Sequence, residues 1–308
     1  MNYTLHQLKI FLKVSELESI TKAAEELHLT QPAISIQLKK LQEQFDLPLV
    51  EVVGRKLHVT DFGKEIVERC RRILDEADGI RYTIEQYKGL LSGRIKISVV
   101  STGKYVIPYF LKDFMDAHPG VEISIDVSNK LRVIEGLNQN DSDFSLVSVL
   151  PKGIEVNQVS LMENRLYLAG HRQYKGMIKT TKDLEKVTLL FREQGSATRS
   201  AMEQYLDQQN VKIGKSMELV SNEAVKQAIN AGIGLSIVPL IGLRTALSNE
   251  NIMIHPLKGL PITTRWNLIY NKRKRLTPAQ EALITHIETH KAEVVEKHFS
   301  WNEYAEMP

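Results

Sequence analysis

The first 60 residues contain three stretches in which apolar residues recur every three or four positions, the spacing of an amphipathic helix. The first stretch runs from about residue 4 to 16, and Thr4 and Gln7 at its start have the spacing of a capping box. The second begins near Ser19. The third begins at Gln31 with Pro32, which suits a first helical turn because proline has no N–H to leave unpaired. Its expected inner face consists of Ile34, Leu38, Leu41 and Phe45.

The opposite face of the third helix is polar and basic, with Gln31, Ser35, Lys39 and Lys40. Two short helices joined by a tight turn are typical of a helix-turn-helix, whose second helix enters the major groove of DNA. The next run, LVEVVGRKLHVT, predicts a β-hairpin with a basic tip that would meet phosphate or the minor groove. We therefore predict a winged helix-turn-helix domain over residues 1–60. The alternative is three packed helices and a surface hairpin that bind nothing.

A proline-free stretch follows from Asp61 to Leu91, and its apolar positions are spaced alternately four and three residues apart. This heptad seam consists of Ile66, Cys70, Ile73, Ala77, Ile80, Ile84, Tyr87 and Leu91. It predicts a long linker helix over residues 61–91 that forms a coiled coil with a second copy, because so narrow a stripe has no other surface to cover it. Two winged domains joined in this way suit a DNA site with approximate two-fold symmetry.

After Ser92, short β-prone pieces alternate with helical stretches such as residues 107–117 and 222–231. The alternation predicts an α/β domain with a mainly parallel sheet. Its length of about 200 residues predicts two lobes. We expect lobe I to comprise residues 92–161 and 266–292 and lobe II residues 162–265. Residues 293–308 form a C-terminal extension to which the sequence assigns no function.

Three loops of this domain place small polar residues between a strand and the start of a helix. They contain Ser101 to Gly103, Gly195 to Arg199, and Val220 to Glu223. Ligands of α/β folds bind where strands lead into helix N-termini, and free N–H groups there favour an anion. Arg199 stands against the positive end of its helix dipole, which a bound anion would offset. The alternative for each loop is ordinary N-capping.

Composition narrows the classes of protein. The chain has 308 residues, of which 43% are hydrophobic and 25% charged, as in an ordinary globular protein. No stretch approaches the roughly 20 apolar residues of a membrane span, and the first helix carries charges and no signal-peptide cleavage site, so we expect a cytoplasmic protein. The net charge of +3 does not by itself favour a nucleic-acid partner, and DNA binding depends on where the charges lie.

No residue pattern indicates catalysis, a cofactor or a metal. His286 and His290 share a helix face but lack a third ligand nearby. Gly232 and Gly234 follow a helix and precede a strand, which is the wrong order for a dinucleotide fingerprint. The alternative functions are a solute-binding protein or an enzyme that uses the two-lobed domain. The helix-turn-helix, the missing secretory signal and the missing catalytic set oppose them.

The segment TKAAEELHLTQPAISIQLKKLQEQFDLPLVEVVGRKLHVTDFG resembles the winged helix-turn-helix of LysR-type bacterial transcriptional regulators. The segments IKISVVSTGKYVIPYFLKDFMDAHPGVEISIDV and SNEAVKQAINAGIGLSIVP extend the resemblance to nearly the whole chain. The resemblance implies a C-terminal domain similar to a type 2 periplasmic binding protein, with a small-molecule effector between its lobes. It also implies double-stranded DNA as a partner, a homodimer through the linker helix and a homotetramer. The expected function is sequence-specific regulation of transcription.

The resemblance implies most members of two sets of site residues, and the basic residues of the third helix and wing and the loops before helices add the others. Those expected to contact DNA are Thr30, Gln31, Pro32, Ala33, Ser35, Ile36, Lys39, Lys40, Arg55 and Lys56. Those expected to line the effector site are Ser101, Thr102, Gly103, Asn129, Ser148, Ser196, Thr198, Arg199 and Asn222. Ile36 stands where many members have a polar residue, so contact with a thymine methyl would replace a polar base contact. The strings EVVGRKLHVT and SNEAVKQA look most like the carbon-fixation branch of the family, which implies an anionic metabolite as effector.

Overall fold

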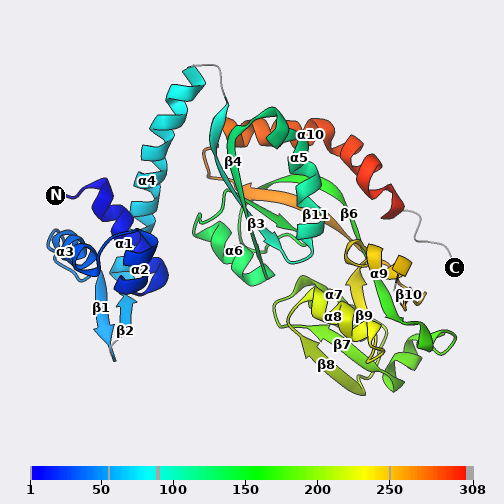
Figure 1. Cartoon of the computed structure of the whole chain (residues 1–308). Helices are drawn as coiled ribbons and strands as arrows, with labels where there is room; N and C mark the ends of the chain where they lie inside the picture. Colours follow the sequence, from blue (N-terminus) through cyan, green and yellow to red (C-terminus); the bar gives the residue numbers. More distant parts are fainter. Residues whose placement is uncertain (1, 55, 88–90, 250, 303–308) are drawn as a thin grey trace. The chain divides into compact units, whose positions relative to one another are not determined.

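The computed structural model describes residues 2–54, 56–87, 91–249 and 251–302. The chain forms two compact units, residues 1–90 and residues 91–308. Figure 1 follows the chain through both units, from the helices of the first to the mixed helices and strands of the second.

The first unit has the predicted helix-turn-helix and wing. Its elements are α1 (Leu5–Leu17), α2 (Ile20–Glu26), α3 (Gln31–Gln42), the antiparallel strands β1 (Val50–Val53) and β2 (Lys56–Val59), and α4 (Asp61–Tyr87). The predicted capping box forms, because the Gln7 N–H donates to Thr4 Oγ1 at 3.2 Å and the Thr4 N–H to Gln7 Oε1 at 2.9 Å. Ser19 and Thr30 cap α2 and α3 through their hydroxyl groups alone, which accept from the Lys22 and Ala33 N–H groups.

The inner face of α3 is as predicted up to its last position. Ile34, Leu38 and Leu41 are buried in the core of the first unit. The helix ends at Gln42, so Phe45 lies beyond it and its ring instead stacks on that of Tyr3, with ring centroids 6.3 Å apart. The prediction that α3 extends to Phe45 is therefore wrong.

The heptad seam is divided among different surroundings. Cys70 is buried in the core of the first unit with Val67 and Leu74, because α1 leaves an apolar face that α4 must cover. Burial raises the pKa of the Cys70 thiol to about 11, which suits its structural role. Ile73 and Ile80 are exposed.

The end of the predicted coiled coil differs from the expectation as well. The helix α4 ends at Tyr87, and Leu91 packs against the core of the second unit just before its first strand. The prediction of a continuous coiled-coil seam over residues 61–91 is therefore wrong at Cys70 and at Leu91, which are covered by other parts of the same chain. The side chains of Ile84 and Tyr87 lie outside the described residues.

The second unit has a seven-stranded sheet in the order β10-β6-β11-β5-β3-β4, with β9 also paired to β6. The strands are β3 (Ser92–Val100), β4 (Gly120–Ser128), β5 (Phe144–Val147), β6 (Val156–His171), β9 (Ser236–Pro239), β10 (Ile252–Ile254) and β11 (Ile262–Asn271), with β7 (Thr188–Arg192) and β8 (Lys215–Leu219) in a separate pair. The α-helices are α5 (Ile107–Ala117), α6 (Lys130–Asn138), α7 (Ala197–Gln208), α8 (Asn222–Asn230), α9 (Arg244–Asn249) and α10 (Pro278–Phe299).

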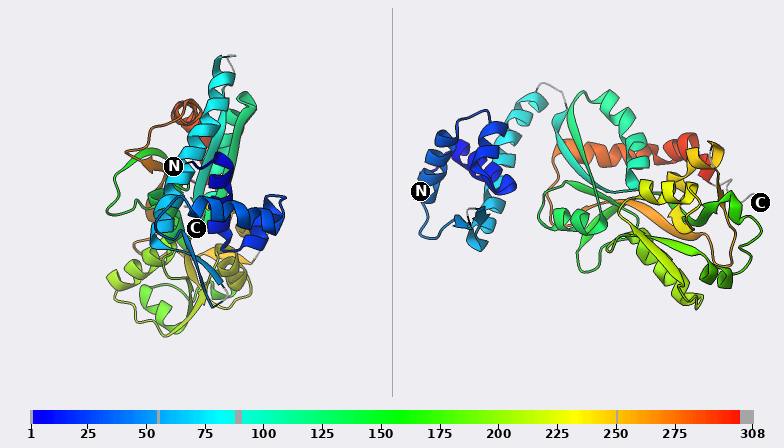
Figure 2. Two further views of the ribbon diagram at one scale, coloured as in Figure 1. Left: turned by 90° about the vertical axis from the view of Figure 1, so that its left-hand side faces the viewer. Right: turned by 60° about the horizontal axis from the view of Figure 1, so that its bottom comes forward.

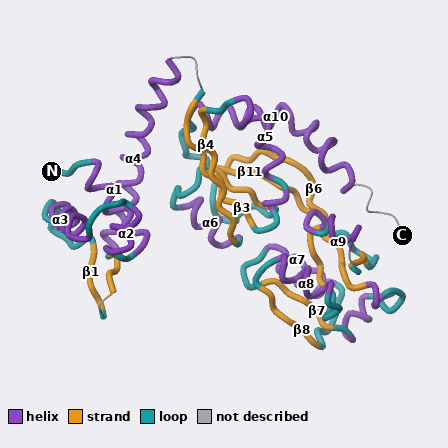
Figure 3. The backbone as a smooth tube through the Cα atoms, in the orientation of Figure 1, coloured by secondary structure: helices purple, strands orange, loops and turns teal. Residues whose placement is uncertain are grey.

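The prediction of a mainly parallel sheet is wrong. Among the named strands of the described residues, the pairs β3–β4, β3–β5 and β7–β8 are parallel and the other pairs are antiparallel. The long strands β6 and β11 run antiparallel to each other along their length, because one enters lobe II and the other returns from it (Figure 3). Their register shifts between Trp266 and Asn267, at the expected boundary of the lobes.

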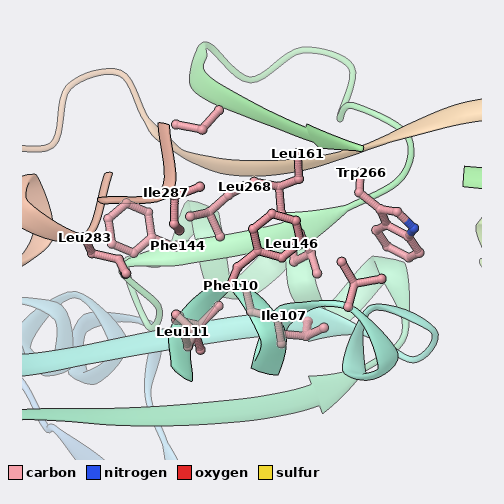
Figure 4. Close-up of a cluster of buried hydrophobic side chains, with 14 of the residues drawn as sticks. Ile107, Phe110, Leu111, Phe144, Leu146, Leu161, Trp266, Leu268, Leu283 and Ile287 are labelled. Atoms are coloured by element: carbon pink, nitrogen blue, oxygen red, sulfur yellow. The ribbon is translucent and has the colours of Figure 1, made fainter. Parts of the chain in front are cut away.

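Separate cores confirm that this unit has two lobes. Lobe I is built around one large cluster, which includes Phe110, Phe144, Trp266 and Leu283 (Figure 4). The helices α5 and α10 pack against each other in this lobe (Figure 2). Two other clusters, centred on α7 and on α8, form the core of lobe II. Within the described ranges, every helix is too short or too polar to span a bilayer.

Candidate functional site

The helix α3 displays most of the residues expected to contact DNA. Thr30 is its N-cap, and Gln31, Pro32 and Ile36 are exposed in the turns that follow. Ala33 and Ser35 are partly exposed, and Lys39, Lys40 and, at the start of β2, Lys56 are exposed. Because these α3 positions recur every three or four residues, they share the outer face of the helix. Arg55 lies outside the described residues.

Gln42, which no sequence pattern singles out, connects α3 to the wing. Its Nε2 donates to the Leu47 carbonyl at 3.0 Å, and its Oε1 accepts from the Leu49 N–H at 2.6 Å. These two bonds fix the loop between α3 and β1, and so the position of the wing relative to the helix. A glutamine at a helix end carries no sequence signal that separates this role from simple solvation.

In the second unit, a cleft opens where β3 and β7 end. It is lined by Val100, Ser101, Thr102, Asn129, Lys130, Ser148, Arg192, Glu193, Ser196, Ala197 and Thr198. Six of the nine predicted effector residues lie in this set: Ser101, Thr102, Asn129, Ser148, Ser196 and Thr198. The cavity measures about 20 Å³, which is room for about one water molecule. The two lobes contact each other here, since Arg192 and Asn222 of lobe II both donate to Ser101 Oγ of lobe I.

Two of the three predicted loops differ from the expectation. The residues after β3 do not begin an α-helix, because Gly103–Tyr105 form a 3-10 turn and α5 begins at Ile107. Gly103 has a packing role, since a Cβ there would come within 2.6 Å of Val99 Cγ1. In the third loop, Ser221 Oγ accepts from the Ala224 N–H at 3.0 Å, so ordinary N-capping explains that loop.

Asn222 and Asn129 contribute through hydrogen bonds with other residues of the chain. Asn222 lines a small pocket beside the cleft, and Thr102 belongs to the lining of both. The Nδ2 of Asn222 donates to Ser101 Oγ at 2.9 Å, and its buried Oδ1 lacks a partner among the described residues. Asn129 lines the cleft and also caps α6, since its Oδ1 accepts from the Arg132 N–H at 3.0 Å. At the start of α7, by contrast, Ser196 makes no side-chain cap bond.

The predicted role of Arg199 does not agree with its contacts. Its Nε donates to Glu203 Oε1 at 2.7 Å, and its Nη1 donates to Glu218 and to the Arg192 carbonyl. The hydrogen bond with Glu203 is the main cause that raises the pKa of Arg199. Two carboxylates of this chain therefore balance its charge, and Arg199 is not among the residues that line the cleft.

The arginine of the cleft is Arg192, which the sequence analysis missed. Its side chain is only 4% exposed, and its Nη1 donates across the cleft to Ser101 Oγ at 3.2 Å. Its Nε and Nη2 each donate to Glu193 at 2.8 Å. A usable signal was present, because Arg192 directly follows the buried strand residues TLLF at the end where α/β folds bind ligands.

Lys130 supplies a second positive charge to the cleft. It is partly buried at the first position of α6, and no carboxylate of the described residues pairs with it. The cleft thus combines two cations, five hydroxyl side chains and the N-terminus of α7, which are groups that bind anions. Among the described residues, no group of His, Cys, Asp and Glu has the arrangement of a metal site.

Comparison with known proteins identifies the family of both units. Residues 5–64 match the bacterial regulatory helix-turn-helix protein family model, lysR family, and residues 88–292 match the LysR substrate binding domain. The HTH-type transcriptional activator CmpR of Synechocystis is 33% identical over 94% of this chain and 96% of its own. The RuBisCO operon transcriptional regulator of Allochromatium vinosum is 34% identical over 92% of this chain and 94% of its own.

Solved structures give the same result. The Synechocystis CcmR regulatory domain, solved in complex with 2-PG, is 27% identical, with a TM-score of 0.62 over 65% of this chain and 98% of its own. Full-length CbnR on its target DNA has the same fold, with 23% identity and a TM-score of 0.67 over 93% of this chain and 99% of its own. These relatives confirm the predicted likeness to regulators of carbon-fixation genes. They are transcriptional regulators and not enzymes, as predicted for this chain. The chain belongs to the LysR family of bacterial transcriptional regulators.

Proposed function

We propose that a small anionic metabolite, bound in the cleft between the lobes, controls how this regulator acts on DNA. The observation that carries the proposal is the buried guanidinium of Arg192 in a cleft that also holds Lys130. The complex of the CcmR regulatory domain with 2-PG supports an effector of this chemistry. The hydroxyl groups of the cleft would bind the oxygen atoms of a phosphate or carboxylate.

The effector would enter after the lobes separate, because a cavity of about 20 Å³ does not hold a metabolite. The hydrogen bonds that Ser101 receives from Arg192 and Asn222 join the two lobes in the closed state. A ligand that replaces these bonds would change the populations of open and closed states, and only its differential affinity for them can do so.

Replacing Arg192 with alanine is expected to weaken anion binding by about ten- to a hundred-fold, because hydrogen bonds to a charged group contribute roughly 1.5–3 kcal/mol. The measurement is a thermal-shift titration of the full chain with 2-PG and other anions of central metabolism. Arg172→Ala is the control, since it removes an exposed arginine of the same lobe that does not line the cleft and should leave the affinity unchanged. An equal loss in both variants would exclude Arg192 as a specific ligand.

We further propose that α3 enters the major groove and that the residues expected to contact DNA do so. Replacing Lys39 and Lys40 together with alanine should lower the slope of log affinity against log salt by about two, because each lysine neutralises roughly one phosphate. Affinity for a duplex carrying the operator is measured at several salt concentrations. Replacing Lys112 of α5 and Lys297 of α10 together with alanine makes the same charge change on exposed positions of the second unit and should not alter the slope. An unchanged slope in the double variant would remove α3 from the interface.

We infer that two copies pair through α4, and that contacts between second units join dimers into a homotetramer. Ile73 and Ile80, 38% and 66% exposed, offer apolar surface on α4 for such a partner. A dimer would present two winged domains to one DNA duplex, as a nearly palindromic site requires. Such a regulator would act in the cytoplasm, where bacterial DNA lies, without a membrane partner.

A further inference from the structure

The guanidinium of Arg192 in the cleft is already paired with a carboxylate of this chain, that of Glu193. Glu193 binds Arg192 in a bidentate manner, with two bonds of 2.8 Å to Nε and Nη2. This is the edge of a guanidinium that best fits a carboxylate or a phosphate. We propose that Glu193 is an internal counterion that the anionic effector must displace, and that it thereby sets the charge of the effectors the cleft accepts. The inference rests on the proposed function.

The position of the pair favours displacement over a purely structural role. Arg192 and Glu193 both line the cleft, and their side chains are 4% and 16% exposed. Arg192 therefore relies on Glu193 as its counterion, because so buried a guanidinium is poorly screened by water. A ligand anion can perform the same task, because it would approach the same guanidinium from within the cleft.

The charge of the lining gives the pair its selectivity. The ionisable residues that line the cleft are Lys130, Arg192 and Glu193, so their formal charges sum to +1. Without Glu193 the sum would be +2, which matches a phosphate monoester. With Glu193 in place, each further negative charge on a ligand meets repulsion from its carboxylate at close range and low dielectric. Glu193 should therefore weaken the binding of multiply charged anions more than that of singly charged ones.

Displacement of Glu193 would also alter the hydrogen bond that Arg192 makes between the lobes. The Nη1 atom of Arg192 donates to Ser101 Oγ in lobe I, whereas Nε and Nη2 are bound to Glu193 in lobe II. An anion that takes the Nε and Nη2 edge must move the guanidinium or release Glu193 into water. Either movement changes the geometry of the bond to Ser101, so exchange of the counterion and closure of the cleft are linked.

A second arginine–glutamate pair in the same lobe provides a matched control. Arg199 and Glu203 are joined at 2.7 Å, but neither residue lines the cleft. Glu203→Gln therefore removes one negative charge from an arginine partner without changing the cleft. A general effect of net charge on anion binding would be equal in Glu193→Gln and Glu203→Gln.

The test measures the affinity of the full chain for acetate, inorganic phosphate and 2-PG by calorimetric titration, for the wild type and both variants. We expect Glu193→Gln to bind phosphate and 2-PG at least about tenfold more tightly, with a smaller gain for acetate, because a close buried charge pair couples strongly. Glu203→Gln should stay within about twofold of the wild type, since it changes only a peripheral charge pair. The unfolding temperature of each ligand-free variant shows that it is folded.

Two results would overturn the inference while leaving the proposed function intact. If the wild type binds 2-PG and Glu193→Gln binds it equally or more weakly, Glu193 only holds Arg192 in position. If Glu193→Gln gains the same factor for acetate and for 2-PG, Glu193 does not select for charge. Failure of all three proteins to bind any of the anions would refute the proposed function itself, and the inference with it.

Discussion

Replacing Gly63 with alanine is expected to disrupt the first unit, because Gly63 is the one described glycine of this unit where an added Cβ meets atoms within 4 Å. Gly63 lies in the first turn of α4, where this helix meets the chain just before the wing. A Cβ there would overlap the carbonyl oxygen of Leu49 and come within 2.9 Å of Val59 Cγ1. The Leu49 carbonyl cannot move freely, because it accepts the Thr60 N–H at 3.1 Å and Leu49 itself is fully buried.

Overpacking of a core costs about 1–3 kcal/mol when side chains can give way, and more when backbone must move. We therefore expect Gly63→Ala to lose roughly 3 kcal/mol or more, a large part of the stability of a small domain. Hydrogen exchange of the α1 amides in the full chain reports this loss, and DNA affinity should fall with it.

Gly79→Ala is the matched control in the same helix. A Cβ at position 79 meets no atom of the described chain within 4 Å, and alanine favours a helix over glycine by about 1 kcal/mol. This variant should protect the α1 amides as well as the wild type or better. If Gly63→Ala is as well protected as Gly79→Ala, the close approach of α4 to Leu49 is not a constraint.

Local sequence patterns predicted the helix starts of the first unit, because capping and helical spacing act over only a few residues. Thr4 with Gln7 and Pro32 after Gln31 each mark a helix start that the structure has. The heptad seam, by contrast, depends on contacts that are distant in the sequence. Cys70 has the spacing of a coiled-coil position, but which surface covers it depends on α1, more than 50 residues earlier. The sequence pattern does not distinguish burial within the chain from burial against a second copy.

The residues of the cleft were predicted only in part, because local patterns show hydroxyl residues but not their distant partners. Hydroxyl residues after strands are visible in the sequence, and Ser101, Ser148 and Ser196 do line the cleft. The arginine was misplaced, because the choice between Arg192 and Arg199 depends on partners far away in the sequence. Arg199 pairs with Glu218, and Arg192 reaches Ser101 in the other lobe. The antiparallel pairing of β6 and β11 could not be predicted locally either, because it arises from the two strands that join the lobes.

The C-terminal extension contains part of the core of lobe I, and this gives a second large prediction. The family match ends at residue 292, but α10 continues to Phe299, and Val294 and Phe299 are buried. The ring of Phe299 stacks on Phe110, with centroids 6.1 Å apart, and meets the ring of Tyr109 edge-on at 5.1 Å. Residues 293–299 therefore have a structural role, whereas residues 303–308 lie outside the described part of the chain.

Phe299→Ala is expected to destabilise the second unit by about 3–5 kcal/mol, the usual cost of removing a buried phenylalanine from a core. Thermal and urea unfolding of the full chain measure the loss. The exposed residue Lys297, two positions earlier in α10, supplies the control, since Lys297→Ala should change stability by less than about 0.5 kcal/mol. Equal stability of the two variants would mean that lobe I is complete without the end of α10. A large loss of stability in Phe299→Ala alone would show that the folded second unit includes residues beyond the family match. The reason is that the aromatic contacts of Phe299 complete the core against which α5 packs.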